Sequence, residues 1–265
     1  MPAVQPCALL LVVGPEWEIE AVTANLAMIA EAEPEAMLGR PLSDLIGSEE
    51  THTLRNRVSW IARDDGEVLD YGVRWGAMTA DVRAVRDGRR YLIEAEPSAE
   101  PRLPDGIGMV RSMNDRLSGT DAVALAERAM RQLQALTGFE RVWLCNASGA
   151  VIAGAKAGQS FGLANASRLI ADCSSEQVEL IGNDRQDLSS RAAFRSPDAD
   201  ELAAYADDGA AASMTMPLRI DGELVATLHA RHSRPRRCGA ERRSVAHLFA
   251  ERLVARMMRH GWSPS

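Results

Sequence analysis

Cysteine is scarce in this sequence. The chain has 265 residues and only four cysteines, which are Cys7, Cys145, Cys173 and Cys238. They lie far apart and form no C-x-x-C pair, so the sequence indicates neither a zinc site nor a thioredoxin-like redox motif. We therefore expect reduced thiols that are mostly buried, because an unpaired cysteine usually behaves as a small apolar residue.

Lysine is almost absent as well. Lys156 is the only lysine, and no G-x-x-x-x-G-K-[ST] phosphate-binding loop occurs. The chain also lacks the G-x-S-x-G elbow of hydrolases, the H-E-x-x-H pair of zinc proteases and a G-x-G-x-x-G loop after a strand. We predict that the chain is not an enzyme and holds no metal; an active site built from scattered carboxylates is the alternative.

Long hydrophobic runs are missing too. A membrane-spanning helix takes about 20 apolar residues, and no stretch of the chain approaches this length. The N-terminal apolar run, residues 7–14, lacks the basic residues and the cleavage site of a signal peptide. We therefore expect a cytoplasmic protein. The net charge of -7 argues against a general nucleic-acid binder, because neutralising phosphates requires a basic surface.

The hydrophobic content that is present, 46% of 265 residues, favours two domains of about 150 residues or less. In the first half, apolar runs bounded by turn residues predict two strands, short helices interrupted by proline and glycine, a longer helix and three more strands. The strands are 8–13, 18–22, 68–77, 80–86 and 91–96, and the longer helix is 51–61. Residues 97–106 are proline-rich and show no periodicity, so we place the domain boundary there.

The second half begins with apolar residues at helical spacing, which predict a helical region over 107–136 with Asp121 as a cap inside it. Strands are predicted at 141–145, 151–155, 213–220 and 224–232. Residues 240–260 form a final amphipathic helix with Met257 and Met258 on its apolar face. The predicted fold class is α/β of the α+β type, with two domains that each have a mainly antiparallel sheet flanked by helices.

Short phrases follow one another along the chain: VQPCALLLV at 4–12, LGRPL at 38–42, LTGFERV at 136–142, SRLIAD at 167–172 and GAAASMT at 209–215. In this order they resemble the PAS–GAF core of bacterial phytochromes, the red-light photoreceptors that hold a linear tetrapyrrole in their GAF domain. The resemblance spans nearly the whole chain. It implies a PAS-like domain over 1–97 and a GAF-like domain over 107–260.

The departures from this family fall on the parts that handle the chromophore. The family attaches biliverdin through a cysteine in an extension ahead of the first phrase, and only six residues precede Cys7. We expect no covalent attachment; attachment through Cys7 itself is the alternative. The Pro-x-Ser-Asp-Ile-Pro phrase that the family has before the position of Arg168 is missing. One family histidine corresponds to Glu201, and another corresponds to Arg231 beside His232.

Positions that resemble the family's anchors for the tetrapyrrole propionates are nevertheless kept. Arginine presents a planar fork that matches a carboxylate, and Ser213 and Thr215 alternate on one predicted strand and so share a face. The candidate ligand-binding residues are Arg168, Arg195, Ser213, Thr215, Glu201, Arg231 and His232. For the arginines, ordinary ion pairs within the protein are the alternative interpretation.

The C-terminal region from 231 to 259 carries nine arginines. In the family it leads into a helix that bundles with its copy, which implies a homodimer; a signalling partner, contact with nucleic-acid phosphates and docking on the chain's own sheet are alternatives. We hypothesise a phytochrome-like sensory module without catalytic activity or covalent bilin that acts through protein–protein interaction. The alternative is a light or ligand sensor that holds a tetrapyrrole, biliverdin or haem, or another carboxylated molecule non-covalently.

Overall fold

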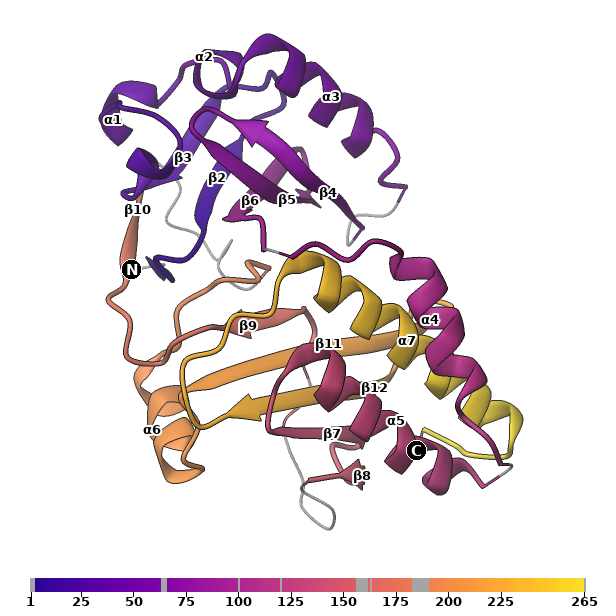
Figure 1. Cartoon of the computed structure of the whole chain (residues 1–265). Helices are drawn as coiled ribbons and strands as arrows, with labels where there is room; N and C mark the ends of the chain where they lie inside the picture. Colours follow the sequence, from indigo (N-terminus) through magenta and orange to yellow (C-terminus); the bar gives the residue numbers. More distant parts are fainter. Residues whose placement is uncertain are drawn as a thin grey trace. The chain divides into compact units, whose positions relative to one another are not determined.

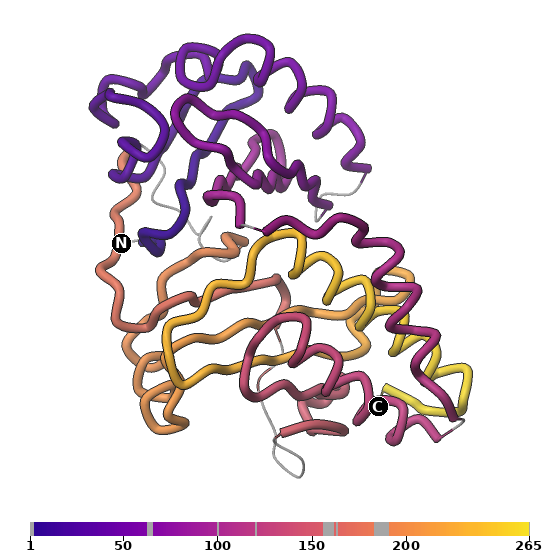
Figure 2. The backbone as a smooth tube through the Cα atoms, in the orientation of Figure 1, coloured from indigo at the N-terminus to yellow at the C-terminus, as the bar shows by residue number. Residues whose placement is uncertain are grey.

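The chain folds into two compact units, each built on one sheet (Figures 1 and 2). The computed structural model describes residues 3–62, 66–99, 101–119, 121–155, 162, 164–182 and 191–264. The first unit contains Met1–Ser98 and Ser174–Pro197, and the second contains Ala99–Cys173 and Asp198–Ser265. The fold class predicted from the sequence, two mixed domains of antiparallel sheets and helices, is confirmed. No helix in the described part of the chain is long and apolar enough to cross a membrane.

The first unit is a seven-stranded sheet with short helices. Its strand order is β1 (Ala3–Val4), β10 (Val178–Gly182), β3 (Ile19–Thr23), β2 (Leu9–Val13), β6 (Arg90–Pro97), β5 (Met78–Asp87) and β4 (Glu67–Trp75). The helices are η1 (Leu26–Met28), α1 (Pro34–Met37), α2 (Ser43–Ile46) and α3 (Ser48–Val58). The five strands and the longer helix expected in this half are all present, because their apolar residues are spaced for burial on one core.

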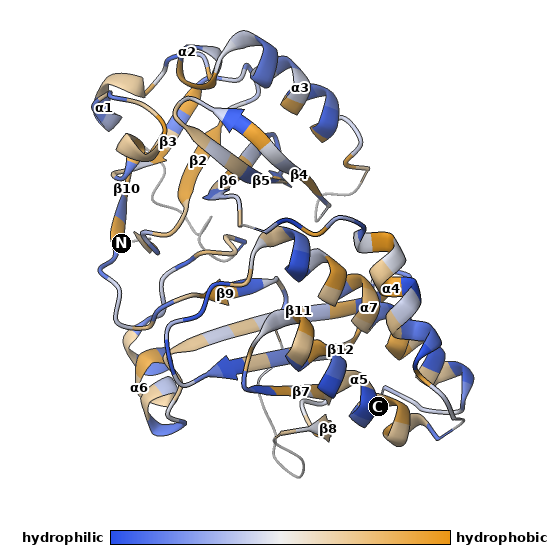
Figure 3. Ribbon diagram, in the orientation of Figure 1, coloured by the Kyte–Doolittle hydropathy of each residue, from blue (hydrophilic) through white to orange (hydrophobic). Residues whose placement is uncertain are grey.

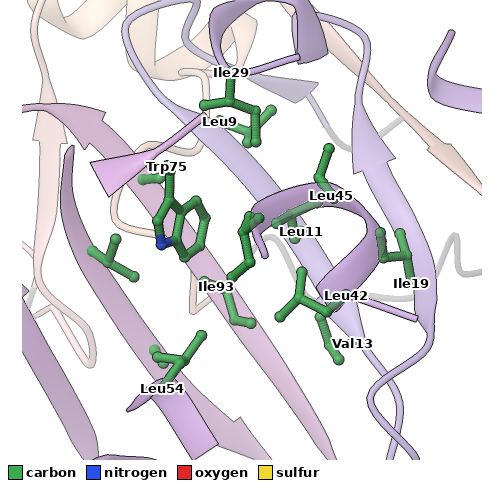
Figure 4. Close-up of a cluster of buried hydrophobic side chains, with 14 of the residues drawn as sticks. Leu9, Leu11, Val13, Ile19, Ile29, Leu42, Leu45, Leu54, Trp75 and Ile93 are labelled. Carbon is green, nitrogen blue, oxygen red and sulfur yellow. The ribbon is translucent and has the colours of Figure 1, made fainter. Parts of the chain in front are cut away.

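This core fills the space between the sheet and the helices, as Figure 4 shows. The β2 strand is buried along its whole length, and its Leu9 and Leu11 contribute to the cluster together with Ile93 of the adjacent β6 and Trp75 of β4. Leu42 lies among them in Figure 4. Each fully buried side chain of this size contributes about 1.5–3 kcal/mol, so the first unit has a hydrophobic core of its own.

Residues 174–197 fold into the first unit although they lie within the segment expected to be GAF-like. β10 pairs antiparallel with both β3 and β1. Glu94 of β6, which is 1% exposed, accepts the backbone N–H groups of Ala193 and Phe194 at 3.0 Å each and pairs with Arg83 at 2.6 Å. A buried carboxylate needs such partners, so this segment and the sheet stabilise each other.

The second unit is a five-stranded antiparallel sheet in the order β8 (Val151–Gly154), β7 (Arg141–Asn146), β12 (Glu223–His232), β11 (Ala212–Ile220) and β9 (Arg168–Ile170). Its helices are α4 (Gly106–Asp115), α5 (Ala122–Thr137), α6 (Ala199–Asp207) and α7 (Ala240–Arg259). The helical region expected over 107–136 is two helices. It is interrupted because Gly119 has a φ of 113° and the side chain of Asp121 caps the N-terminus of α5.

The second sheet has two different faces. Alternation along the strands places Leu144, Met216 and Leu228 on one face, and all three are buried. Figure 1 shows α4, α5 and α7 gathered on one side of the sheet, and in Figure 3 the ribbons of α5 and α7 carry mixed apolar and polar colours as amphipathic helices do. On α7 Met257 is buried as expected, whereas Met258 is 37% exposed; the apolar stripe is narrower than the sequence suggested.

Candidate functional site

The other face of the second sheet brings together four of the candidate residues. Ser213 of β11 pairs with Arg231 of β12, and Thr215 of β11 pairs with Arg168 of β9. Directly opposed residues of antiparallel strands point to the same side, and so do residues two apart on one strand. Arg168, Ser213, Thr215 and Arg231 therefore share one face. We call this surface, together with Arg141, Trp143 and His229 on it, the arginine face.

Arg168 of the arginine face is paired with a carboxylate of the same unit. Its Nη2 donates to Oε2 of Glu201 at 3.0 Å, and its Nη1 donates to Oε1 of the same side chain. This is the two-point geometry in which a guanidinium and a carboxylate bind most strongly. Glu201 thus comes together with Arg168, but as its partner within the protein.

Glu201 is placed by the N-terminus of α6. Asp198 accepts the backbone N–H of Glu201 at 2.9 Å, and Glu201 accepts the backbone N–H of Asp198 at 3.0 Å. This reciprocal capping box satisfies two donors of the first turn and fixes the Glu201 carboxylate beside the sheet. The sequence S-P-D-A-D-E at 196–201 thus contains the capping box, and the capping box orients the Glu201 side chain that pairs with Arg168.

Arg231 is enclosed by a second carboxylate and two aromatic rings. Its Nη1 donates to Oδ2 of Asp208 at 2.5 Å, and Oδ1 of Asp208 is 3.1 Å from Nη1 of Arg141. The Arg231 guanidinium also lies 5.6 Å from the Trp143 ring centre and 5.0 Å from that of Tyr205, within range of cation–π attraction. Burial raises the pKa of Tyr205, whose hydroxyl forms a hydrogen bond with Ser213.

His229 forms the apolar floor of the arginine face with Trp143. Their rings stack at 5.4 Å with 9° between their planes, and Nδ1 of His229 lies 3.5 Å from the Thr215 hydroxyl. Burial, with the charge of Arg231 beside it, lowers the pKa of His229 to about 4. The imidazole is therefore neutral near pH 7 and packs as an aromatic ring.

The two remaining candidate residues lie elsewhere. His232, one residue after Arg231, points away from the arginine face. It accepts the backbone N–H of Arg234 at 2.9 Å, and its Nε2 is 3.5 Å from Glu140. Arg195 belongs to the first unit, where its backbone forms a bridge with Val4.

Sequence reasoning missed several members of the arginine face. His229 stands two residues before Arg231, so strand alternation alone would have placed it there. Trp143 and Arg141 lie on this face because β7 pairs with β12, and no local sequence pattern specifies that pairing. The members of the arginine face that were not predicted are Arg141, Trp143 and His229; Tyr205 and Asp208, which contact this face from α6 and its end, were not predicted either.

Within the described ranges no group of three or more His, Cys, Asp or Glu side chains could hold a metal ion. The four cysteines, all in the described part of the chain, form no disulfide, and three of them, Cys7, Cys145 and Cys238, are buried. Burial raises the pKa of Cys145 to about 11, so its thiol stays protonated and weakly nucleophilic.

Comparison with known proteins identifies both units. A model of the GAF domain matches residues 121–257, and a model described as a PAS fold matches residues 2–98. No curated protein matches the chain in sequence.

Solved structures match over nearly the whole chain. The chromophore-binding domain of Stigmatella aurantiaca phytochrome P1 is 23% identical with a TM-score of 0.77, over 96% of this chain and 95% of that one. The chromophore-binding domain of an unusual bacteriophytochrome from R. palustris is 20% identical with a TM-score of 0.76, over 98% and 95%. The chain covers 58% of the longer photosensory core module of the S. aurantiaca phytochrome. The chain belongs to the GAF domain family, with a PAS fold ahead of its GAF domain, and has the fold of a bacteriophytochrome chromophore-binding domain.

Proposed function

We propose that this chain is a phytochrome-like sensory or regulatory module that has no catalytic activity, holds no covalent bilin and acts through protein–protein interaction. The observation that carries the proposal is the pairing of Arg168 with Glu201. The guanidinium that resembles a propionate anchor of the family already has a carboxylate partner, supplied by the residue that replaces a family histidine.

A tetrapyrrole propionate would have to compete with Glu201 for Arg168. Displacing Glu201 would leave a carboxylate beside the sheet without its cation, which costs several kcal/mol for a fully buried pair. The cost here is about 1–2 kcal/mol, because the Arg168 and Glu201 side chains are 15% and 27% exposed and water screens the pair. The described residues of the arginine face thus fit a chromophore's carboxylates poorly.

The aromatic residues of the same face support this reading. Trp143 is fully buried under His229, and Arg231 lies between Trp143 and Tyr205. These side chains thus pack on one another, as the core of a ligand-free GAF domain would. Because the sequence carries none of the common hydrolase, zinc-protease or dinucleotide motifs, we also propose that the module is not an enzyme.

The second candidate function is a light or ligand sensor that holds biliverdin, haem or another carboxylated molecule without a covalent bond. The Ser213 and Thr215 hydroxyls on the arginine face favour it, as does the similarity to structures named chromophore-binding domains. In that case the ligand would bind with Glu201 and Asp208 displaced.

An absorption spectrum separates the two functions. The chain is expressed in cells supplied with biliverdin, and in parallel with haem, and purified beside a phytochrome chromophore-binding domain as the positive control. We expect a colourless protein from cells in which the control is coloured. Pigment that co-purifies in stoichiometric amount, with or without a light-induced change, would replace the first proposal by the second.

A further inference from the structure

Helix α6 is attached to the second unit differently from the other helices. None of its nine residues, Ala199–Asp207, is buried. By contrast, α5 and α7 bury seven and eight residues. The hydrophobic effect, which holds most helices onto their sheets, therefore contributes little to the position of α6.

What holds α6 is a row of polar side chains. Glu201, Tyr205 and Asp208 are four and three residues apart, so they lie along one face of the helix and its end. Glu201 reaches Arg168, Tyr205 reaches Ser213 and the Arg231 guanidinium, and Asp208 reaches Arg231 and Arg141. Each contact ends on the arginine face, so α6 covers it through charge and one aromatic ring.

The arginine face without α6 would be a cationic surface with an aromatic floor. Three guanidiniums, those of Arg141, Arg168 and Arg231, lie around the stacked rings of Trp143 and His229. His229 adds no charge near pH 7 because burial lowers its pKa to about 4. Charge complementarity selects an acidic partner for such a surface, and aromatic and arginine residues are the types that dominate binding energy at interfaces.

We propose that the arginine face is a docking surface for an acidic helix of a partner protein, and that α6 occupies it when the partner is absent. The partner helix presents a carboxylate, an aromatic ring four residues later and a second carboxylate three residues after that, the spacing of Glu201, Tyr205 and Asp208. The proposal rests on the proposed function as an interaction module, and it names the surface and the chemistry of the partner.

Because α6 is part of the same chain as the arginine face, it sets the affinity that a partner helix needs. A segment of the same chain competes at an effective concentration in the millimolar range, so a partner helix must bind the bare face more tightly than α6 does. Contacts that are mostly ionic weaken with salt. The exchange between α6 and a partner is therefore sensitive to ionic strength.

The test uses a synthetic peptide of residues 196–210 as the probe. The host is the whole chain carrying Glu201→Gln and Asp208→Asn, which weakens its own α6 contacts, and the control peptide carries the same two changes. We expect the native peptide to bind this host at least tenfold more tightly than it binds the unchanged protein. We also expect it to bind this host at least tenfold more tightly than the control peptide binds the same host. Equal binding of the two peptides, or no binding of the native one at millimolar concentration, overturns the proposal.

Hydrogen exchange on the unchanged protein gives a second measurement that needs no variant. The amides of α6 should exchange at least tenfold faster than those of α5 and faster still as salt is raised, while the amides of β11 and β12 keep their rates. Protection of α6 equal to that of α5 at every salt concentration overturns the proposal. A colourless protein whose face binds no peptide leaves the proposed function standing and removes only this docking surface, whereas bound pigment removes the proposed function itself.

Discussion

Arg168 of β9 and Glu201 of α6, thirty-three positions apart, form a two-point ion pair with Nη2 of the arginine 3.0 Å from Oε2 of the glutamate. In the proposed function this pair takes the place of a contact between Arg168 and a ligand. We proposed this because Arg168 resembles a propionate anchor of bacterial phytochromes and Glu201 corresponds to a family histidine. The carboxylate bound to Arg168 then comes from the protein and not from a ligand.

Asp208 should stabilise the second unit through its two arginines. We expect Asp208→Asn to lower the free energy of unfolding by about 1–3 kcal/mol, because Arg141 and Arg231 lose their charged partner. Asp207→Asn, one residue earlier and exposed, is the matched control and should change it by less than about 0.5 kcal/mol. Denaturant unfolding measures both. Equal effects of the two substitutions would show that Asp208 contributes only surface charge.

His229 should make the second unit less stable in acid. Its pKa of about 4 in the folded protein lies below the ordinary value of 6.5, so the unfolded chain binds the proton more readily. The stability that the neutral His229 contributes is fully present above about pH 6.5. It is lost as the pH falls towards 4, by up to about 3 kcal/mol in the free energy of unfolding.

Unfolding measured between pH 7 and 4 in the unchanged protein and in His229→Gln isolates this contribution. Between pH 7 and 4 the free energy of unfolding should change less with pH in His229→Gln than in the unchanged protein. The carboxyl groups of Glu140 and Glu241, whose pKa values hydrogen bonds lower, add their own loss of stability only below about pH 4.5 and are common to both proteins. The same pH dependence of unfolding in His229→Gln would show that His229 is not the source of the loss of stability in acid.

Glu94 should hold residues 192–194 against the first sheet. We expect Glu94→Gln to lower the free energy of unfolding of the first unit by about 2–4 kcal/mol, because Arg83 and two backbone N–H groups lose a buried carboxylate. The exposed Glu35→Gln is the control. Limited proteolysis should also cut residues 174–197 faster in Glu94→Gln. Unaltered cleavage together with unaltered stability would contradict this role.

Self-association through α7 would involve its exposed apolar residues. Leu248 is 39% exposed on this helix, so in a dimer formed through α7 the substitution Leu248→Glu should raise the dissociation constant at least tenfold. Sedimentation velocity measures it, with Trp60→Ser in the first unit as a control for a generally less apolar surface. A dimer that is insensitive to Leu248→Glu would place the contact elsewhere.

Local sequence patterns determined much of the fold. Alternating apolar residues specified the strands, Asp121 and Asp198 begin helices because their side chains cap the first turn, and the apolar stripe of α7 follows from its period. The order of short phrases indicated the PAS and GAF units, which the family models confirm. These features depend on neighbours within a few residues, and such neighbours are visible in a sequence.

The tertiary structure alone decided where distant residues meet. Residues 178–182 form β10 of the first sheet because they pair with β3, and the buried Glu94 of the same sheet accepts the backbone N–H of Phe194 further along the chain. The sequence by itself named Arg168, Glu201 and Arg231 as candidates for one site. Only the register of β9, β11 and β12 and the docking of α6 showed that Glu201 and Asp208 neutralise those arginines, because an ion pair depends on distance in space and not on separation along the chain.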